Sequence, residues 1–283
     1  MELVEIRKLM IVSVASDETL AELMVLKGGN ALALIHKIGS RASLELDFSL
    51  EGDFLDPNEI GARLFRALRD RFDSAGLLLF DEEFGPKPRT ARSDSSPKWG
   101  GYKAAFKLIS KEEHKALKGD LDAMRRQSQE SGPGHRRVFE IEISKFEYCA
   151  GNVVAEIDAF PVRVYTPAMI AIEKLRAICQ QMSEYIARRH PAPRARDFYD
   201  IHAIVTTTGV ELAAAEQGDL IRSMFSAKEV PLALLSKLEK YREFHRQDWP
   251  AVEVSVSGEL QPFDYYYDFV LTQAKGLEAL WIE

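Results

Sequence analysis

The sequence predicts an α/β front half followed by a mainly helical back half, with a soft boundary near residue 166. In the front half, several short segments alternate apolar and polar residues, as strands do when one face is buried. After Thr166 and Pro167 the apolar residues recur at helical spacing, as in Ile170, Leu175 and Ile178. We therefore expect a sheet-containing domain first and a helical domain second.

The elements of the front half can be assigned in chain order. Polar Asn30 follows the Gly28-Gly29 pair and can cap the helix after it. Residues 85–101 are rich in Pro, Gly, Ser and positive charge, which favours a loop. The expected elements are a helix at 18–23, a strand at 24–27, helices at 31–37 and 57–72 around a strand at 44–50, a strand at 102–109, a helix at 112–129, and strands at 138–144, 153–158 and 162–165.

The back half begins with a helix that carries clear start signals. Thr166 is a suitable N-cap and Pro167 suits the first helical position, which predicts a helix to about Arg188. Asp197 is then expected to open a second helix, to about Val205. The predicted domains are residues 1–165, with a basic insertion near 85–137, and residues 166–283.

Composition argues against several classes of protein. No apolar stretch approaches the roughly 20 residues that a membrane span needs. The N-terminal residues are acidic and lack the basic and apolar segments of a signal peptide, which predicts a cytoplasmic protein with no membrane partner. Cys149 and Cys179 stand apart from each other, and the six histidines lack metal-ligand spacing, which argues against a zinc site.

Charge is distributed unevenly along the chain. The net charge of −7 argues against a protein that coats nucleic acid without selectivity. Residues 87–137, however, contain 13 Lys and Arg against 6 Asp and Glu. A basic segment on an acidic body can guide a polyanion to one place. A solvated loop and helix surface would have the same composition.

Two acidic residues, Glu45 and Asp47, follow the glycine turn. Because side chains alternate along a strand, both are expected on one face, with the apolar neighbours on the other. Adjacent carboxylates repel each other unless a cation lies between them. The Gly28-Gly29 turn can expose backbone N–H groups to a phosphate. This combination is typical of Mg²⁺-dependent phosphoryl or nucleotidyl transfer, although the exposed face of an ordinary strand can also carry such a pair.

Four motifs occur in a fixed order. They are Lys27-Gly28-Gly29-Asn30-Ala31-Leu32, Arg41-Ala42-Ser43-Leu44-Glu45-Leu46-Asp47-Phe48, Glu173-Lys174-Leu175-Arg176-Ala177 and Arg194-Ala195-Arg196-Asp197-Phe198-Tyr199-Asp200. This set resembles the AbiEii/AbiGii nucleotidyltransferase toxins, the family that also contains the MenT-type toxins of mycobacteria. The resemblance spans roughly residues 20 to 205. It depends on the order of all four motifs, because glycine turns and Arg-Asp pairs are common alone.

The resemblance implies an α/β (α+β) fold, with a DNA polymerase β-like nucleotidyltransferase core, a mixed sheet and a helical C-terminal part. The acidic pair of the family corresponds to Glu45 and Asp47, which would hold Mg²⁺, or Mn²⁺, against the triphosphate of an NTP substrate. A third carboxylate is expected on a later strand. Glu142 is the favoured candidate, because the family often has an Ile-x-Ile-Glu-Ile strand, and Asp158 is the competitor.

The resemblance also implies nucleotide-binding and catalytic residues. The residues implied to bind the nucleotide are Gly28, Gly29, Asn30, Arg41 and Ser43. The residues implied to be catalytic are Asp47, Lys174 and Asp197. Lys174 would supply positive charge for the triphosphate, whereas Asp197 could orient that lysine, act as a base or bind the nucleotide. Arg41 and Ser43 have an alternative role in fixing the turn into the strand.

Two residues depart from the family pattern. Glu45 stands where the family usually has aspartate and is one methylene longer, which bears on activity and metal preference because Mg²⁺ geometry is exacting. Asn30 replaces the usual Thr or Ser and keeps a polar cap without the hydroxyl.

The function that the resemblance implies is that of a bacterial toxin neutralised by a cognate antitoxin. The toxin would transfer a nucleotide from an NTP to an acceptor and halt translation and growth, with the 3′ end of tRNA as the leading acceptor among RNAs. The basic segment at 87–137 is the expected acceptor surface. One alternative is transfer to a hydroxyl of a protein or small molecule. Another is a non-catalytic binding protein that retains the fold.

Overall fold

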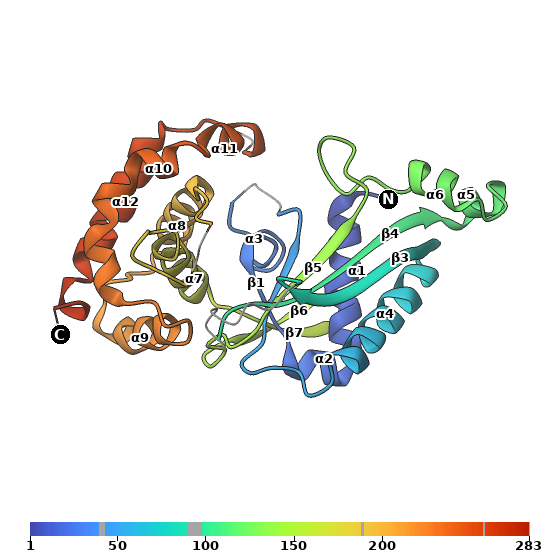
Figure 1. The fold of residues 1–283 in the computed structure, drawn as a ribbon, viewed down its shortest axis with the longest axis horizontal. Helices are drawn as coiled ribbons and strands as arrows, with labels where there is room; N and C mark the ends of the chain where they lie inside the picture. The colour runs from blue at the N-terminus through green and yellow to red at the C-terminus, as the bar shows by residue number, and fades with distance from the viewer. Residues whose placement is uncertain (40–42, 90–97, 188–189, 257, 283) are drawn as a thin grey trace. The chain divides into compact units, whose positions relative to one another are not determined.

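The computed structural model describes residues 1–39, 43–89, 98–187, 190–256 and 258–282. They form two compact units (Figure 1). Unit 1 comprises Met1–Ile35, Ala42–Ser93 and Gly100–Val164, and unit 2 comprises His36–Arg41, Asp94–Trp99 and Tyr165–Glu283. Unit 2 therefore includes two short segments that precede residue 166 in the sequence.

A seven-stranded mixed sheet forms the centre of unit 1 (Figure 1). The strands lie in the order β3-β4-β5-β2-β1-β7-β6. Their bounds are β1 Val25–Lys27, β2 Leu46–Ser49, β3 Leu77–Lys87, β4 Gly101–Ser110, β5 Phe139–Ser144, β6 Val153–Ile157 and β7 Phe160–Val164. The pairs β2–β5 and β1–β7 are parallel and the other neighbours are antiparallel. The predicted α/β class with a mixed sheet is confirmed.

One face of this sheet is apolar and is covered by helices. Alternate residues of the central strands are buried, as Phe48 in β2 and Ile141 in β5 illustrate. Helix α4 (Pro57–Ser74) packs Phe65 and Phe72 against Phe106 of β4. Helix α1 (Leu3–Ser16) contacts α4, β2 and β7. The alternate side chains of the same strands point to the opposite, polar face.

Two elements of unit 1, α1 and β3, are missing from the sequence prediction. Helix α1 is buried from Met10 to Val14, so no polar stripe marks it as amphipathic. Strand β3 starts with apolar residues but continues with Asp81-Glu82-Glu83, and acidic residues are depleted in strands. Each of these three carboxylates pairs with an arginine in the structure.

Other elements differ from prediction at their ends. The expected strand at 44–50 begins only at Leu46, so Glu45 precedes it. The expected helix at 112–129 is two helices, α5 (Lys111–Ala116) and α6 (Leu121–Gln127), because Lys118 and Gly119 have positive φ angles between them. The segment expected to be a helix at 31–37 is π-helical over Ala31–Ile35. A short helical turn, α3 (Gly28–Asn30), comes directly before it. The helix predicted at 18–23 is observed as α2 (Glu18–Leu23).

Unit 2 is helical, as predicted. Its α-helices are α7 Pro167–Cys179, α8 Ala195–Thr208, α9 Gly218–Ser226, α10 Arg242–Arg246, α11 Trp249–Ser255 and α12 Phe263–Gly276, and 3₁₀ segments cover Ala215–Gln217, Leu232–Tyr241 and Glu278–Leu280. Thr166 caps α7 by accepting a hydrogen bond from the Met169 N–H at 3.2 Å. Helix α7 ends at Cys179, before the predicted end near Arg188. Helix α8 begins at Ala195, so Asp197 lies in its first turn instead of opening it.

The aromatic segment of α12 serves packing in unit 2. Phe263 and Tyr267 are buried against Phe198 of α8. No helix within the described part of the chain is both long and apolar enough to span a membrane.

Candidate active site

One transverse row of residues crosses five neighbouring strands of unit 1. Lys27 of β1 pairs with Asp47 of β2, and Asp47 pairs with Glu142 of β5. Glu142 pairs in turn with Lys103 of β4, and Lys103 pairs with Gly85 of β3. Directly paired residues share one face of a sheet, and neighbouring strands lie about 4.8 Å apart. Asp47 and Glu142 are therefore side by side on the polar face, with a lysine on each flank.

Gly28 brings the main chain against the Asp47 carboxylate. It directly follows β1 and has a φ angle of 73°. A Cβ atom at this position would lie 2.6 Å from Asp47 Oδ2, which is too close for any side chain. Both the backbone conformation and the close approach therefore require glycine. Gly29 is buried in the same turn, so the predicted glycine turn does lie beside the predicted carboxylate.

Asn30 is buried and holds the segment that leads into β2. Its Nδ2 donates to the Glu45 carbonyl at 2.7 Å and to the Ser43 carbonyl at 3.3 Å. Its Oδ1 has no hydrogen-bond partner within the described residues. Asn30 thus fixes the backbone next to the carboxylate row. Ser43 is half-buried in this segment, and Arg41 lies outside the described residues.

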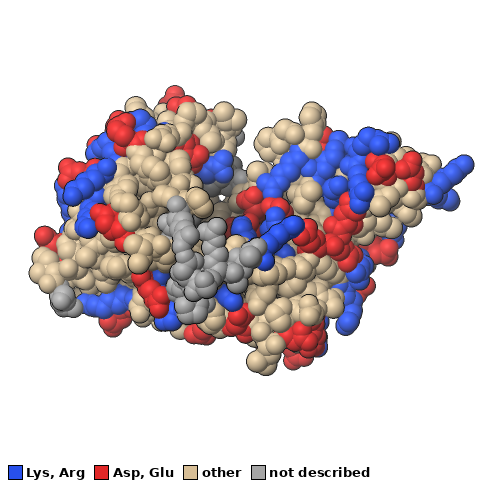
Figure 2. Space-filling view, in the orientation of Figure 1, with Lys and Arg blue, Asp and Glu red and all other residues tan. Residues whose placement is uncertain are grey.

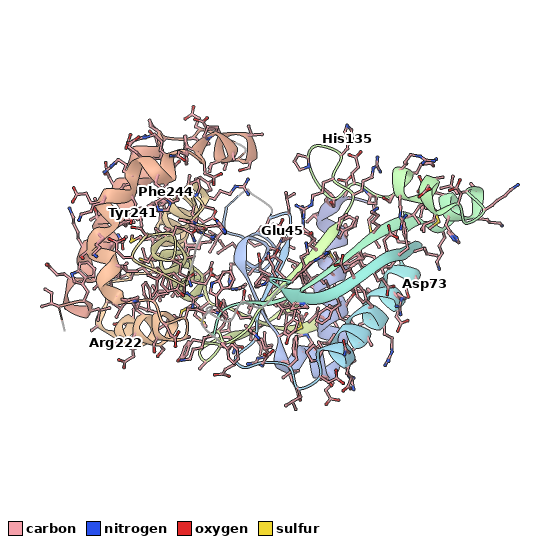
Figure 3. All side chains as sticks on the ribbon, in the orientation of Figure 1. Glu45, Asp73, His135, Arg222, Tyr241 and Phe244 are labelled. Atoms are coloured by element: carbon pink, nitrogen blue, oxygen red, sulfur yellow. The ribbon has the colours of Figure 1, made fainter. Side chains whose placement is uncertain are left out.

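Glu45 lies just before β2 (Figure 3). An arginine, Arg136, neutralises it. Arg136 Nη1 lies 3.0 Å from Glu45 Oε1, and the same guanidinium also pairs with Glu140. Partial burial lowers the pKa of Arg136, but Glu45 and Glu140 outweigh that effect and raise it. The Glu45 carboxylate is thus held by Arg136 instead of projecting alone from the strand.

The two candidates for a third carboxylate lie in different parts of unit 1. Glu142 is the direct partner of Asp47 in the parallel β2–β5 pair. Asp158 lies in the turn between β6 and β7, where its charge acts on Lys8 of α1. The strand register therefore brings Glu142 beside Asp47.

Lysines accompany the carboxylates of the polar face. Lys87 pairs with Glu142, and Lys103 Nζ lies 2.6 Å from Glu140 Oε1. On the other flank, Lys27 Nζ lies 3.3 Å from Ser144 Oγ and 3.5 Å from a Glu147 carboxylate oxygen. Figure 2 shows Lys and Arg side chains interspersed with Asp and Glu over unit 1. Positive and negative side chains alternate on the polar face, so this face does not carry charge of a single sign.

The donor set suits a divalent cation that also binds substrate. No group of three or more acidic, His or Cys side chains gathers closely enough to hold a metal ion within the described ranges. Asp47 and Glu142 supply two carboxylates on adjacent strands. Mg²⁺ is commonly held by one or two carboxylates together with substrate phosphates and water. The pair thus fits a nucleotide-bound Mg²⁺ and does not form a closed protein cage.

Unit 2 contains a buried cluster of charges around Lys174 of α7. Lys174 Nζ lies 3.0 Å from Asp197 Oδ1 and 2.7 Å from Asp200 Oδ2, and these side chains are 5–8% exposed. Arg194 also pairs with Asp197. Burial alone would lower the pKa of Lys174 and raise that of Asp197. The opposite charges outweigh burial, so the pKa of Lys174 is raised and that of Asp197, facing Arg194 and Lys174, is lowered.

His245 of α10 joins this cluster at Arg194, the residue before α8. It is fully buried, and its Nδ1 accepts a hydrogen bond from the Arg194 N–H at 3.1 Å. Burial lowers the pKa of His245 to about 4, with Asp197 opposing and Arg194 reinforcing the effect. His245 is therefore neutral near pH 7, with its proton on Nε2.

Sequence reasoning did not select Asp200, Arg194 or His245 as site residues. Asp200 follows Asp197 by three residues, a spacing that places both on one face of a helix and could have been recognised. Arg194 lies within the fourth motif. His245 has no local signal, because α10 is remote in sequence from α7 and α8.

A mixed sheet that carries a carboxylate pair beside a glycine turn, joined to a helical unit, is the arrangement of a nucleotidyltransferase. The sequence matches, over residues 11–269, the family described as nucleotidyl transferase AbiEii toxin of type IV toxin–antitoxin systems. The chain belongs to this family and is a nucleotidyltransferase of the toxin–antitoxin class.

Solved structures with a similar chain include a Helicobacter pylori protein, JHP933, and the nucleotidyltransferase toxin MenT4 from Mycobacterium tuberculosis. JHP933 is 18% identical, with 98% of this chain and 90% of that chain covered and a TM-score of 0.47. MenT4 is 14% identical, with 98% and 82% covered and a TM-score of 0.47. A comparison with curated proteins found no match.

Proposed function

We propose that this toxin transfers a nucleotidyl group from an NTP to the 3′ end of an RNA, with tRNA as the leading acceptor, in a Mg²⁺-dependent reaction. The family implies a cognate antitoxin that restrains the activity. Modification of the tRNA end would block aminoacylation or its use in translation, and growth would stop.

The observation that carries this proposal is the direct pairing of Asp47 with Glu142 beside Gly28. Two carboxylates on adjacent strands supply ligands for one cation. The main chain at Gly28 approaches the Asp47 carboxylate so closely that phosphates bound to the turn would lie next to that cation. Asn30 supports both features by tying the turn to the segment before β2.

The reaction joins the acceptor hydroxyl to the nucleotide. The hydroxyl oxygen bonds to the α-phosphorus, the bond to the pyrophosphate oxygen breaks, and the hydroxyl proton passes to water. A Mg²⁺ ion supplies charge neutralisation at the phosphates and lowers the pKa of the hydroxyl. Asp47 and Glu142 would hold this ion. Glu45 would bind it as well only if its ion pair with Arg136 were broken.

Lys174 and Asp197 are proposed to contribute from unit 2. An ammonium group has three donors, and Lys174 uses two of them on Asp197 and Asp200. A role for Lys174 in the reaction is proposed from the family motif in which it stands. Asp197 would then act as a positioning residue that fixes the direction of the lysine, with Arg194 and His245 holding Asp197 in place.

The test is transfer of label from each α-³²P-labelled NTP to total RNA, with Mg²⁺ or with a chelator. We expect one NTP to label a tRNA-sized band, and both the chelator and Asp47→Asn to reduce labelling by more than about 1,000-fold, because the phosphate charge is no longer neutralised. Asp73→Asn is the matched control, since Asp73 pairs with Lys111 on the surface of unit 1.

Two results would contradict parts of the proposal. Labelling of protein or of a small molecule instead of RNA would contradict the proposal that RNA is the acceptor. Growth arrest that persists with Asp47→Asn would indicate a non-catalytic binding protein.

A further inference from the structure

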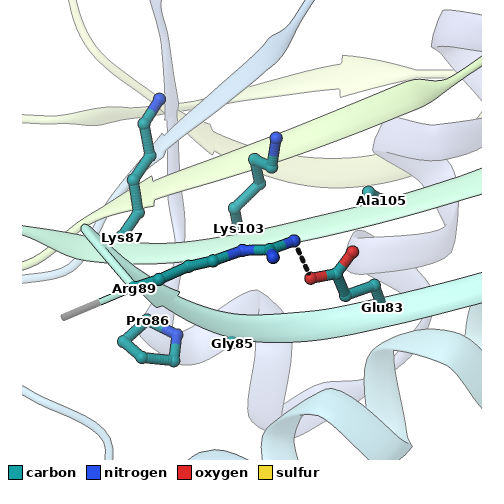
Figure 4. Close-up of a pocket in the computed structure, with 7 residues that line it drawn as sticks. All are labelled: Glu83, Gly85, Pro86, Lys87, Arg89, Lys103 and Ala105. Carbon is teal, nitrogen blue, oxygen red and sulfur yellow. Dashed lines mark hydrogen bonds and ion pairs between the residues drawn. The ribbon is translucent and has the colours of Figure 1, made fainter.

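A pocket lined by three cations lies on the polar face of the β3–β4 ribbon (Figure 4). Lys87, Arg89 and Lys103 form its rim, together with one acidic residue, Glu83, which pairs with Arg89. Its remaining lining comes from Gly85, Pro86 and Ala105. The small side chains between the cations are what leave the hollow, and a Cβ atom at Gly85 would meet no atom within 4 Å.

This pocket continues the carboxylate row. Gly85 pairs with Lys103, Lys103 pairs with Glu142, and Lys87 forms an ion pair with Glu142. By the spacing of strands, Lys103 lies two strands, or about 10 Å, from Asp47. The pocket and the glycine turn are on opposite sides of β2, because β5, β4 and β3 follow it in one direction and β1 in the other.

We propose that this pocket binds backbone phosphates of the RNA acceptor, next to the nucleotide whose hydroxyl reacts. The inference rests on the proposed function and adds where the acceptor binds. In phosphoryl and nucleotidyl transfer, the attacking and leaving oxygens lie in line on opposite sides of the phosphorus. With the triphosphate at the glycine turn, the pyrophosphate leaves on the β1 side of Asp47, and the acceptor approaches from the β5 side, where the pocket lies.

The exposure of the cations fits a polymeric anion. Arg89 is 79% exposed and Lys87 51% exposed, so both reach solvent. Lys87 is the last residue of β3, and Arg89 follows it by two residues. Arginine forms bidentate contacts to phosphate. Arg89 pairs with an exposed carboxylate, Glu83, and such a surface pair exchanges readily because it contributes little stability.

The experiment measures binding of the full chain to a short single-stranded oligoribonucleotide with a 5′ fluorescein and a free 3′ hydroxyl, by fluorescence anisotropy without NTP. Arg89→Gln removes one cation. Gly85→Val fills the hollow without changing charge, and a β-branched residue suits a strand. Arg69→Gln is the matched control, because Arg69 is also exposed and also pairs with a β3 carboxylate, Glu82. Thermal unfolding verifies that each variant is folded.

We expect Arg89→Gln and Gly85→Val each to weaken RNA binding about fivefold or more, and Arg69→Gln to match the wild type. For Arg89→Gln, the slope of log Kd against log salt should fall by about 0.7, the value for one phosphate contact on a single strand. Affinity for a non-hydrolysable NTP analogue with Mg²⁺, measured by calorimetry, should stay unchanged in both variants.

Three outcomes would overturn the inference. RNA binding equal to wild type in both variants would exclude the pocket as an acceptor site, and transfer to RNA by the wild type would then leave the proposed function standing. Loss of affinity for the NTP analogue in the variants would indicate that the pocket binds the triphosphate instead of the RNA. If the wild type neither binds the RNA nor labels total RNA, the proposed function fails as well.

Discussion

At the scale of single residues, Gly28 carries two constraints at once. Its φ angle is positive, and its missing side chain makes room for Asp47 Oδ2. Gly28→Ala should therefore displace the carboxylate and reduce transfer by about 100-fold, the cost of a misplacement near 1 Å. The strained backbone should lower the free energy of unfolding by about 1–3 kcal/mol.

The measurements for Gly28→Ala are the rate of label transfer and urea unfolding. Gly52→Ala is the control, because a Cβ atom there meets no neighbour within 4 Å and its backbone is not in the left-handed region. Wild-type activity in Gly28→Ala would mean that the contact with Asp47 is not needed for catalysis.

His245 gives the protein a pH-dependent stability. Its pKa is about 4 in the folded state, against an ordinary value of 6.5. Between these values the unfolded chain binds more protons than the folded one, so stability falls as pH falls from about 6.5 to 4. The loss amounts to about 3 kcal/mol once pH is below both values.

A chemical denaturation series from pH 7.5 to pH 4 measures this dependence. His245→Asn keeps an acceptor for the Arg194 N–H but does not titrate, so its stability should vary much less with pH. Asp197 adds nothing in this window, because its lowered pKa means that its contribution is lost only in stronger acid. An unchanged slope in His245→Asn would assign the pH dependence to other groups, such as His202, whose pKa burial also lowers.

At the scale of elements, helices α7 and α8 are joined by the buried charges of Lys174, Asp197 and Asp200. Lys174→Met would remove the ammonium group that pairs with both buried carboxylates, Asp197 and Asp200. We expect it to lower the free energy of unfolding by about 3–5 kcal/mol, the usual effect of removing one partner of a buried ion pair. Adding Asp200→Asn to this variant should restore part of the loss.

Urea unfolding at pH 7 measures both variants. Lys237→Met is the control, because Lys237 also pairs with a carboxylate of unit 2, Glu184, but at the surface, where the expected change is below about 1 kcal/mol. A small effect of Lys174→Met would show that the cluster contributes little to the packing of α7 on α8.

How well an element could be predicted depended on how local its signal is. Helix α4 has an apolar stripe, and its start carries Asp56 and Pro57, so both its type and its beginning follow from the sequence. Strand β3 was missed because its acidic residues need arginines from α4 and α6, and from the chain after the strand. The break between α5 and α6 depends on positive φ angles at Lys118 and Gly119, which only the folded backbone reveals.

At the scale of the whole molecule, unit 2 depends on chain segments from the front half. His36 Nε2 lies 2.7 Å from the Tyr165 carbonyl, and Lys228 donates to the Lys98 carbonyl at 3.1 Å. A fragment of residues 166–283 lacks these partners. We expect it to unfold at least several degrees below the intact chain, since about 1 kcal/mol corresponds to a shift of this size in a small domain.

Scanning calorimetry of the fragment and of the intact chain measures this difference. A second fragment, which adds residues 98–165, should recover part of the lost stability if the Lys98 contact matters. Equal unfolding temperatures for the intact chain and for residues 166–283 would instead support an independent helical domain, as the sequence predicts.

The candidate site could be predicted only where its residues share a local motif. Gly28 and Asp47 belong to neighbouring motifs, and the structure brings them into contact. The choice between Glu142 and Asp158 required the register of β5 against β2, which no short window of sequence contains. The pairing of Glu45 with Arg136 is equally non-local, and it was not foreseen.

The parallel pairing of β2 with β5 also sets when the site can form during synthesis. Asp47 leaves the ribosome long before Glu142. The parallel partner of β1, which is β7, is synthesised later still. Contacts between such distant segments are slow to form, because a long loop must close first. A nascent chain that ends before β5 therefore has no carboxylate pair. The Asp47–Glu142 pair can therefore form only after most of unit 1 has been translated.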